Sequence, residues 1–168
     1  MPTELFNTKE LKHSYAFIVD GDKAIDLENH RILFSVSSAI VDRDNERVLP
    51  KALLAAIKDR RTFMANPICL PCHMHRLDSG KAPCVGAWDP DTAVINAQQL
   101  VDMVLEFAVE YDLSKEYWYL YSKRFMRAVS IGYKTLEWRK VKDETTGQEI
   151  YEIDRKSTRL NSSHESPS

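Results

Sequence analysis

The stretch Arg-Ala-Val-Ser-Ile-Gly-Tyr-Lys at residues 127–134 alternates large and small side chains in the way that a β-strand does. One face is large and apolar and the other is small, with Val129, Ile131 and Tyr133 on the first and Ala128, Ser130 and Gly132 on the second. Ser130 is the reactive group on the small face, which leaves room for another molecule to approach. Most serines in strands donate to a neighbouring carbonyl, so alternation alone favours a half-buried strand with a structural serine. The rest of the chain decides whether Ser130 has a chemical role.

The composition is ordinary for a globular protein. The 168 residues are enough for one domain with a real core, and 43% of them are hydrophobic. The net charge of −2, from 23 basic and 25 acidic residues, gives no electrostatic reason to expect a nucleic acid or a membrane surface as a partner. No apolar run approaches the roughly 20 residues of a membrane span, and the N-terminus lacks the pattern of a signal peptide. We therefore expect a cytoplasmic protein whose three cysteines stay reduced.

Short apolar stretches separated by turn signals predict several strands and two helices. The strands are predicted at residues 15–20, 31–42, 83–89, 99–109, 128–136, 136–141 and 149–154, with a turn at Asp89-Pro90-Asp91. The helices are predicted at residues 51–64, opened by Pro50, and at about 113–126, capped by Asp112 or Ser114. The stretch 99–109 alternates loosely, so a helix is an alternative there. Because strands and helices do not alternate strictly, we predict an α+β domain on a mostly antiparallel sheet or barrel flanked by helices.

The two ends of the chain differ in composition from the part between them. Residues 1–14 are polar and mixed, and we predict a flexible N-terminal arm. Residues 155–168 (RKSTRLNSSHESPS) have no apolar period and are predicted to be disordered. This last stretch also resembles a translated sequencing-adapter or vector string, so we expect it to be foreign to a domain at residues 15–154 that is truncated at its C-terminus. The same ending in an intact genome would contradict that expectation.

The densest cluster of reactive side chains is Cys69-Leu-Pro-Cys72-His73-Met-His75. Its Cys-x-x-Cys-His core is also the attachment motif of c-type haem, but haem attachment needs an export signal, which the sequence lacks. Two thiolates and two imidazoles form a complete tetrahedral zinc set, and Cys84 could replace one of them. Structural zinc sites usually draw their ligands from two separated segments, and adjacent residues of an extended strand point to opposite faces. Zinc binding is thus an alternative function, small buried core residues are the structural interpretation of Cys69 and Cys72, and the main expectation is a protein without cofactor.

His73 and His75 lie two residues apart and would share a face of an extended segment. They are either exposed or hydrogen-bonded loop residues, or one of them is a general base, because imidazole has a pKa suited to proton transfer near neutrality. A catalytic serine needs such a base, since a free hydroxyl is a poor nucleophile. Residues far apart in sequence can meet in a fold, so a pair of Ser130 with His73 or His75 is compatible with the sequence.

From about residue 32 to residue 154 the chain resembles the HK97-type phage prohead (capsid maturation) serine proteases. Three segments match in the order of that family: Val-Leu-Pro-x-Ala-Leu with a helix at residues 48–57, Asn-Pro-x-x-Leu-x-x-His at 66–73 followed by Val85-Gly86, and an aromatic and basic helix leading into Arg-Ala-Val-Ser-Ile-Gly-Tyr at 117–133. The last segment is the most specific of the three. The resemblance implies a fold similar to that of the herpesvirus assemblins, an antiparallel barrel surrounded by helices.

The resemblance also implies a serine endopeptidase activity. Ser130 corresponds to the family's nucleophile and His73 to its base, with His75 as the near competitor. The implied reaction is acyl transfer, in which the imidazole takes the serine proton and the serine attacks a peptide bond. Backbone N–H groups near Gly132 or Gly86 would stabilise the tetrahedral anion.

The family's third catalytic member is an acidic residue on a strand beyond the serine, expected just past Asp154. Glu149, Glu152 and Asp154 remain, but none lies in a matching segment, so we expect the third member to be missing from this chain. The implied partners are the phage scaffold and major capsid proteins as substrates, inside the assembling prohead in the host cytoplasm, and a second copy of the chain in a homodimer. A capsid-assembly component that kept the fold and lost the activity is the remaining alternative.

Overall fold

The computed structural model describes residues 12–37, 41, 45–71 and 83–158, without the side chains of residues 12–16, 22, 130–136 and 154–158. Within these ranges there are two α-helices, α1 (Pro50–Ile57) and α2 (Asp112–Ser122), and two short 3₁₀ helices, η2 (Asp22–Ala24) and η3 (Phe63–Ala65). The strands of the described part are β1 (Lys12–Ile18), β2 (Ile25–Asp26), β3 (Arg31–Ser35), β4 (Glu46–Val48), β5 (Ile68–Cys69), β6 (Gly86–Ile95), β7 (Val101–Phe107), β8 (Ala128–Lys142) and β9 (Glu149–Thr158).

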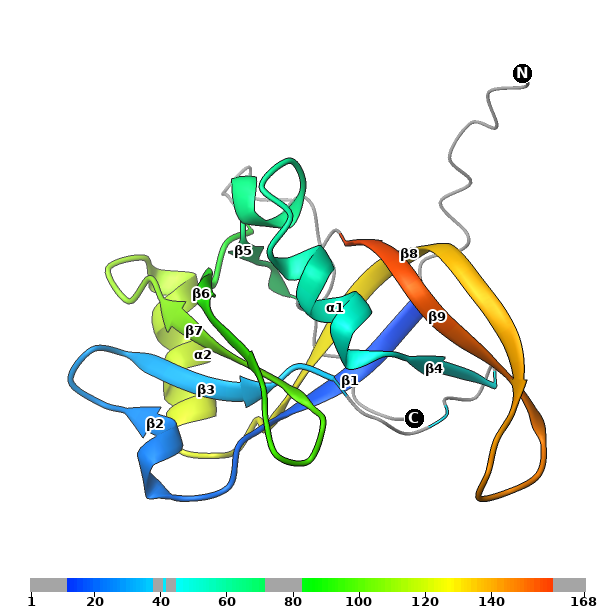
Figure 1. The fold of residues 1–168 in the computed structure, drawn as a ribbon. Helices are drawn as coiled ribbons and strands as arrows, with labels where there is room; N and C mark the ends of the chain where they lie inside the picture. The colour runs from blue at the N-terminus through cyan, green and yellow to red at the C-terminus, as the bar shows by residue number, and fades with distance from the viewer. Residues whose placement is uncertain (1–11, 38–40, 42–44, 72–82, 159–168) are drawn as a thin grey trace.

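All of these strands join one sheet, whose order is β4-β9-β8-β1-β3-β7-β6-β5, with β2 beside β3 (Figure 1). Each neighbouring pair is antiparallel except β4 and β9, which run parallel. The predicted α+β class with a mostly antiparallel sheet is therefore confirmed. The strands predicted at residues 128–136 and 136–141 are found as one continuous strand, β8, and the strand predicted at 149–154 is found as β9, which pairs with it.

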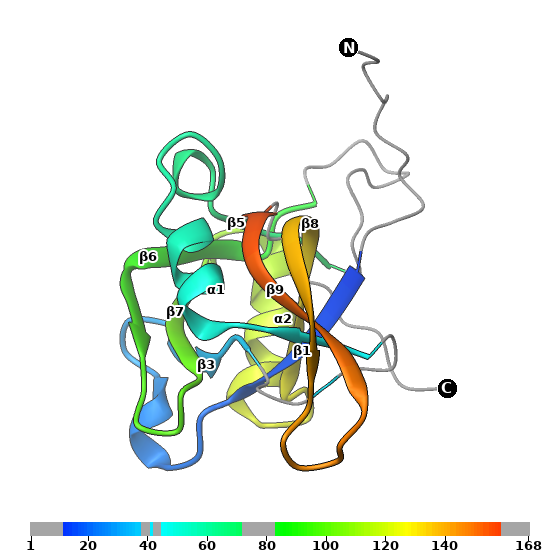
Figure 2. The same ribbon diagram turned by 45° about the vertical axis from the view of Figure 1, so that its right-hand side comes forward.

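The sheet curls around α1 into an open half-barrel (Figure 2). Helix α1 contacts both β9 and β6, which are five places apart in the strand order. Five strand spacings would put these strands about 24 Å apart in a flat sheet, more than twice the ~10 Å diameter of a helix. One helix can touch both strands only if the sheet bends toward it, so α1 lies on the concave face.

Alternation along the central strands determines which face is buried. In β3 every second residue is buried, and Ile32 and Phe34 are fully so. Their partners across the β3–β7 ladder, Leu105 and Met103, are also fully buried, so all four side chains lie on the same face. Helix α1 adds Leu53 to this core from the concave side. Burying one such side chain contributes about 1.5–3 kcal/mol relative to leaving it exposed.

Helix α1 is shorter than predicted and ends at Ile57 instead of near residue 64. Soon after this end, the Asp59 carboxylate accepts a hydrogen bond from the backbone N–H of Arg61 at 3.0 Å and another from the hydroxyl of Thr62 at 3.1 Å. Such local side-chain bonds favour a turn over a further turn of helix. The predicted helical stretch therefore continues only as the 3₁₀ helix η3, whose Phe63 is buried.

The caps predicted for α2 are wrong. The N-cap residue is Tyr111, which makes no side-chain cap bond, and the helix ends at Ser122 instead of at residue 126. Ser114 lies inside the first turn, is fully buried, and donates its hydroxyl to the backbone carbonyl of Val85. This acceptor is 29 residues away in the sequence, so the local pattern could not reveal it. The bond ties the start of α2 to the residue that precedes β6.

The predicted strands at residues 83–89 and 99–109 are found as β6 and β7, and the helix considered for 99–109 is wrong. Strand β6 begins at Gly86 and continues through the predicted turn at Asp89-Pro90-Asp91. Its register with β7 shifts between Asp89 and Val94. The turn signal therefore produces a bulge, which is where a strand can accommodate proline.

Strand β9 extends beyond the predicted end of the domain at residue 154. Its last four residues, from Arg155 to Thr158, pair with β8 between Glu137 and Tyr133. At the other end of the chain, β1 begins at Lys12, inside the predicted arm of residues 1–14. Composition alone assigns both segments to flexible ends, but the open hydrogen-bonding groups of a neighbouring strand order them. Residues 1–11 and 159–168 lie outside the described residues.

Charged side chains join β4 to the β8–β9 hairpin. Arg47 contacts Asp143 at 3.2 Å and Glu152 at 3.1 Å, and Arg139 contacts Glu152 at 2.9 Å. The two carboxylates are only 7% and 9% exposed, so removal of their arginine partners would leave buried charge without compensation. Asp143 also accepts a hydrogen bond from the backbone N–H of Thr146 at 2.8 Å, which shapes the turn of the hairpin.

The backbone N–H of Thr146 holds the pKa of Asp143 below its ordinary value of 3.8, and the charge of Arg47 acts in the same direction. Because the folded-state pKa is lowered, the stabilisation from Asp143 is present above pH 3.8 and is lost as the pH falls through the lower folded-state pKa. Asp143→Asn should therefore lower the melting temperature at neutral pH, and its difference from wild type should shrink on acidification. Thermal unfolding between about pH 7 and pH 2 measures both effects.

The control for this experiment is Glu144→Gln, which removes the same charge at the exposed neighbouring position. It should leave the melting temperature at neutral pH close to that of wild type. A loss from Asp143→Asn that is as large at pH 2 as at neutral pH would contradict the account.

Candidate functional site

Ser130 lies in the interior of β8, as the sequence predicts. Its backbone pairs with Tyr15 of β1, and two residues later Gly132 pairs with His13. The preceding residue, Val129, is 3% exposed and belongs to the core, which confirms the apolar face of the predicted strand at that position. The side chain of Ser130 is among those that the structure does not describe, so its role as nucleophile stays a prediction.

The connection from α2 into β8 is held by three hydrogen bonds just before Ser130. The Tyr121 hydroxyl donates to the carbonyl of Ala128 at 2.6 Å. The backbone N–H of Met126 donates to the carbonyl of Leu120 at 3.1 Å. The N–H of Ile18 in β1 donates to the carbonyl of residue 127 at 2.9 Å. These bonds fix the backbone from which the serine strand begins.

His73 and His75 lie outside the described residues, and so does Cys72. The structure does describe the residues on both sides of this segment. Before it, Cys69, Leu70 and Pro71 are buried. After it, the backbone N–H of Val85 donates to the carbonyl of Cys69 at 2.9 Å. Cys69 and Val85, on either side of the gap at residues 72–82, therefore lie side by side, and a contact between His73 and Ser130 stays a prediction.

Gly86 is buried where β5, β6 and β7 meet. It pairs with Cys69 on one side and with Phe107 on the other. A Cβ atom at Gly86 would lie 2.1 Å from the backbone oxygen of Glu106, so the backbones of β6 and β7 approach each other closely here. This contact gives a packing reason for glycine at residue 86, while its predicted place near the tetrahedral anion stays a prediction.

Two of the acidic residues left at the end of the domain, Glu149 and Glu152, are occupied or distant from the serine. Glu149 forms an ion pair with Lys140 at 2.5 Å. Glu152 is held by the two arginines described above and pairs with Arg139, nine residues beyond Ser130 along β8. Nine strand residues correspond to about 30 Å of backbone. Neither glutamate is therefore placed to serve as the third catalytic member.

Two of the three cysteines lie in the described part of the chain. Cys69 is buried and Cys84 is partly exposed. The interpretation of Cys69 as a small core residue is confirmed by its 4% exposure. Over the described ranges, no group of three or more His, Cys, Asp or Glu side chains could hold a metal ion. Because Cys72, His73 and His75 fall in the gap at residues 72–82, the zinc alternative stays a prediction.

Two residues in this region have roles that the sequence did not predict. Tyr121 fixes the start of β8, and the buried Ser114 links α2 to Val85 beside Gly86. An aromatic residue in a mixed helix and a serine near a helix start each have a common local explanation. Only their hydrogen-bond acceptors, seven and 29 residues away in the sequence, distinguish them, and the pattern within each helix does not reveal these acceptors.

Gly86→Ala should destabilise the protein by about 3 kcal/mol or more, at the upper end for a single substitution. The added methyl group meets a backbone carbonyl, which cannot rotate away as a side chain would. Urea unfolding measures the change, and Ala87→Ser at the exposed next residue is the matched control. A loss below about 1 kcal/mol would show that β6 and β7 separate without strain.

Tyr121→Phe should cost about 1 kcal/mol, since it removes the donor to Ala128 and leaves the aromatic packing in place. Tyr119→Phe removes a hydroxyl from a side chain that is 56% exposed, and should stay within about 0.5 kcal/mol of wild type. Equal effects of the two substitutions in chemical denaturation would argue against an anchoring role for the Tyr121 hydroxyl.

In the part of the chain that the structure describes, neither helix has the length and apolar composition needed to cross a membrane. No family model, curated protein or solved structure matches the chain.

Proposed function

We propose that the protein is a serine endopeptidase of the prohead-maturation type, with Ser130 as its nucleophile. The observation that carries the proposal is the setting of the stretch at residues 127–134. It follows an aromatic helix, enters a curled antiparallel sheet, and has Ser130 at an interior strand position paired with β1. That setting agrees with the assemblin-like fold that the resemblance implies, and we include this fold in the proposal.

In the proposed reaction, His73 takes the proton from the Ser130 hydroxyl, and the serine oxygen attacks the carbonyl carbon of a peptide bond. The same imidazole then gives the proton to the leaving amine, and water releases the acyl group from Ser130. Backbone N–H groups near Gly132 or Gly86 stabilise the negative oxygen of the tetrahedral intermediate. His75 replaces His73 as base in the second version of the proposal.

The third member of the site is proposed to lie on the continuation of β9 in the natural protein. Strand β9 runs antiparallel to β8 toward the serine, and Thr158 pairs with Tyr133, three residues short of Ser130. A strand that continued with the natural sequence would pass beside Ser130 and could place a carboxylate near the imidazole. We therefore propose that the chain is truncated, and that residues 155–168 replace the natural ending.

The proposed substrates are the scaffold and major capsid proteins of a phage. Cleavage would take place inside the assembling prohead in the host cytoplasm, and the protease would be a homodimer. A capsid-assembly domain without activity is the competing proposal. It has the same fold, but its Ser130 does not act as a nucleophile.

Ser130→Ala should abolish cleavage of the scaffold and capsid proteins in a version of the chain that carries the natural C-terminus. Removal of a serine nucleophile costs about 10⁴-fold or more in the rate of acyl transfer. Gel analysis of co-expressed scaffold protein measures it. The matched control is Ser122→Ala at the end of α2, where the hydroxyl donates to the Tyr119 carbonyl at 3.3 Å, and it should leave cleavage unchanged. Cleavage that persists in Ser130→Ala would reject the proposal.

The base is identified by comparing His73→Ala with His75→Ala in the same assay. We expect His73→Ala to abolish cleavage and His75→Ala to cleave almost as wild type does, because only His73 matches the family's spacing.

The zinc content of the purified wild-type protein tests the alternative function, which is a metal-binding domain. One bound zinc per chain that is lost in both histidine variants, together with an absence of cleavage, would favour the metal-binding domain.

A further inference from the structure

Three of the five residues that connect α2 to β8 are basic. Lys123 and Arg127 are exposed and Arg124 is partly exposed. In the part of the chain that the structure describes, none of these three cations forms an ion pair. Arg47 and Arg139 differ from them, because each holds a carboxylate. The connection from α2 to β8 therefore presents positive charge that the described side chains do not neutralise.

Two hydrogen bonds hold the basic connection in place. The guanidinium of Arg124 donates to the backbone carbonyl of Gly21 at 3.0 Å, and the guanidinium of Arg127 donates to the carbonyl of Arg124 at 3.1 Å. The dipole of α2 favours a cation near its end, at Lys123. Arg127 lies five residues beyond that end, so the stability of the helix does not account for the whole group.

The neighbouring loop around Gly21 carries charges of both signs. Asp20 and Asp22 lie on either side of Gly21 in the sequence, and Lys23 follows them. Residues 20–23 and 123–127 together contain four basic and two acidic residues, so an excess of two positive charges remains. Because the net charge of the whole chain is −2, this positive charge is a local property of the surface.

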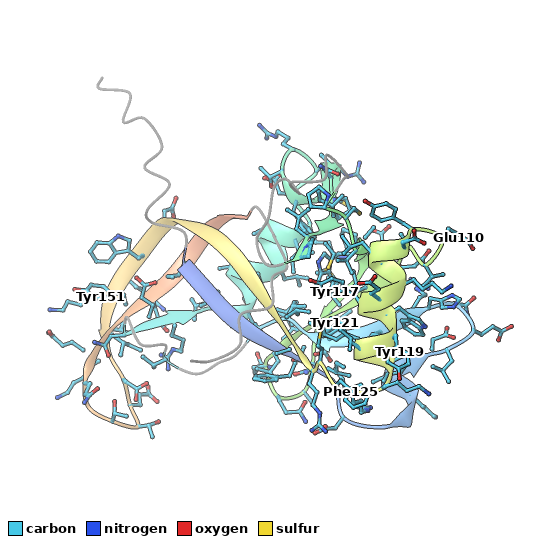
Figure 3. The ribbon with its side chains drawn as sticks, turned by 180° about the vertical axis from the view of Figure 1, so that it is seen from behind. Glu110, Tyr117, Tyr119, Tyr121, Phe125 and Tyr151 are labelled. Carbon is cyan, nitrogen blue, oxygen red and sulfur yellow. The ribbon has the colours of Figure 1, made fainter. Side chains whose placement is uncertain are left out.

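Exposed aromatic rings lie beside these cations. Phe125 stands between the basic residues and is 72% exposed, and its ring centroid lies 6.4 Å from that of Tyr119, which is 56% exposed. Figure 3 shows both rings near the same end of α2. On β1, Phe17 is 57% exposed and pairs with Ala128, the residue after Arg127. Exposed apolar side chains that gather in this way indicate an interaction surface.

These side chains lie next to the strand of the proposed nucleophile. We call them the basic–aromatic surface, which consists of Tyr119, Lys123, Arg124, Phe125 and Arg127. Arg127 comes three residues before Ser130, a distance of about 10 Å along extended backbone. About three residues of an extended peptide span the same distance. A substrate whose cleaved bond lies at Ser130 can therefore contact this surface with a nearby segment of the same chain.

We propose that the basic–aromatic surface binds an acidic segment of the protein substrate that also carries an apolar side chain. The cations attract carboxylates, and the rings of Phe125 and Tyr119 give the apolar side chain a contact. Charge complementarity of this kind selects partners and speeds their association. The inference rests on the proposed protease function, since it names a property of the substrate. Single-stranded nucleic acid also binds cations and rings, but a chain of net charge −2 repels a long polyanion.

Fluorescence anisotropy of the full chain with a labelled peptide tests the inference. The probe is a short peptide in which glutamates surround one phenylalanine, and the comparison peptide has glutamine in place of every glutamate. Wild type should bind the glutamate peptide about tenfold more tightly than the glutamine peptide. Added salt should weaken the binding, because exposed charges are screened.

The main variant combines Lys123→Glu with Arg127→Glu and should bind the glutamate peptide about tenfold more weakly than wild type does. The matched control reverses two adjacent exposed cations elsewhere, with Arg60→Glu and Arg61→Glu. It should stay within about twofold of wild type, because it makes the same change in net charge far from the proposed contact. Phe125→Ala should also weaken the binding, since it removes the most exposed ring.

A peptide with lysine in place of every glutamate checks that the main variant is folded. It should bind the variant reversed at Lys123 and Arg127 more tightly than it binds wild type. The inference is overturned if that variant binds the glutamate peptide as well as the control variant does. It is also overturned if the glutamine peptide binds wild type as tightly as the glutamate peptide does.

Single-stranded oligothymidylate with the same number of negative charges as the peptide is the remaining probe. If it binds more tightly than the glutamate peptide, the surface belongs to a nucleic acid and the inference is overturned. None of these measurements involves cleavage, so their failure leaves the Ser130 proposal to its own test. If peptide binding holds but Ser130→Ala still cleaves, the protease proposal fails and the assignment of the acidic partner as a substrate fails with it.

Discussion

Helix α1 is buried between two strands that stand far apart in the sheet order, and this burial keeps the sheet curled. Leu53 and Ile57 of α1 are both fully buried on the concave face. Loss of one large aliphatic side chain from such a site costs about 2–5 kcal/mol, out of a total stability of about 5–15 kcal/mol for a domain. The contacts of α1 with β9 and β6 therefore constrain the whole molecule. They also set the distance between the strands around Ser130 and the strands that anchor the segment at residues 72–82.

Strand β8 runs from the proposed site at Ser130 to the hairpin that it forms with β9. Its first half pairs with β1 and contains Ser130, and its second half pairs with β9. Arg139 in the second half and Arg47 of β4 share the buried Glu152. This pairing of opposite charges explains why the hairpin and the short parallel strand β4 stay together. The carboxylate of Glu152, one of the acidic residues that remain near the end of the predicted domain, is therefore held in ion pairs.

The elements with strong local patterns could be predicted from the sequence. Apolar stretches between turn signals predicted the central strands, and alternation predicted the serine strand. The errors lie where a distant residue or a competing bond decides the outcome. Asp59 ends α1 early by bonding to Thr62, and Ser114 bonds to Val85 instead of capping its helix. The last residues of β9 are polar, but β8 gives them hydrogen-bonding partners that composition does not reveal.

The candidate site could be predicted only in part for the same reason. The backbone of Ser130 was expected in a strand, and it is there. The pairing of Ser130 with His73 is a contact between segments more than fifty residues apart in the printed sequence, so no local pattern can establish it. The third member stays a proposal, since no segment of the printed sequence matches the pattern expected for it. Local chemistry thus suggested the nucleophile, whereas the complete site depends on long-range arrangement.

The central claim is that Ser130 is an activated nucleophile. The most direct measurement is mass spectrometry of peptides from the chain with its natural C-terminus, after reaction with a fluorophosphonate probe. The account predicts one covalent adduct, located on Ser130, that is lost when His73 is replaced by alanine. A chain that cleaves its substrate but carries the adduct on another residue, or that is fully folded and takes up no probe at Ser130, would contradict it.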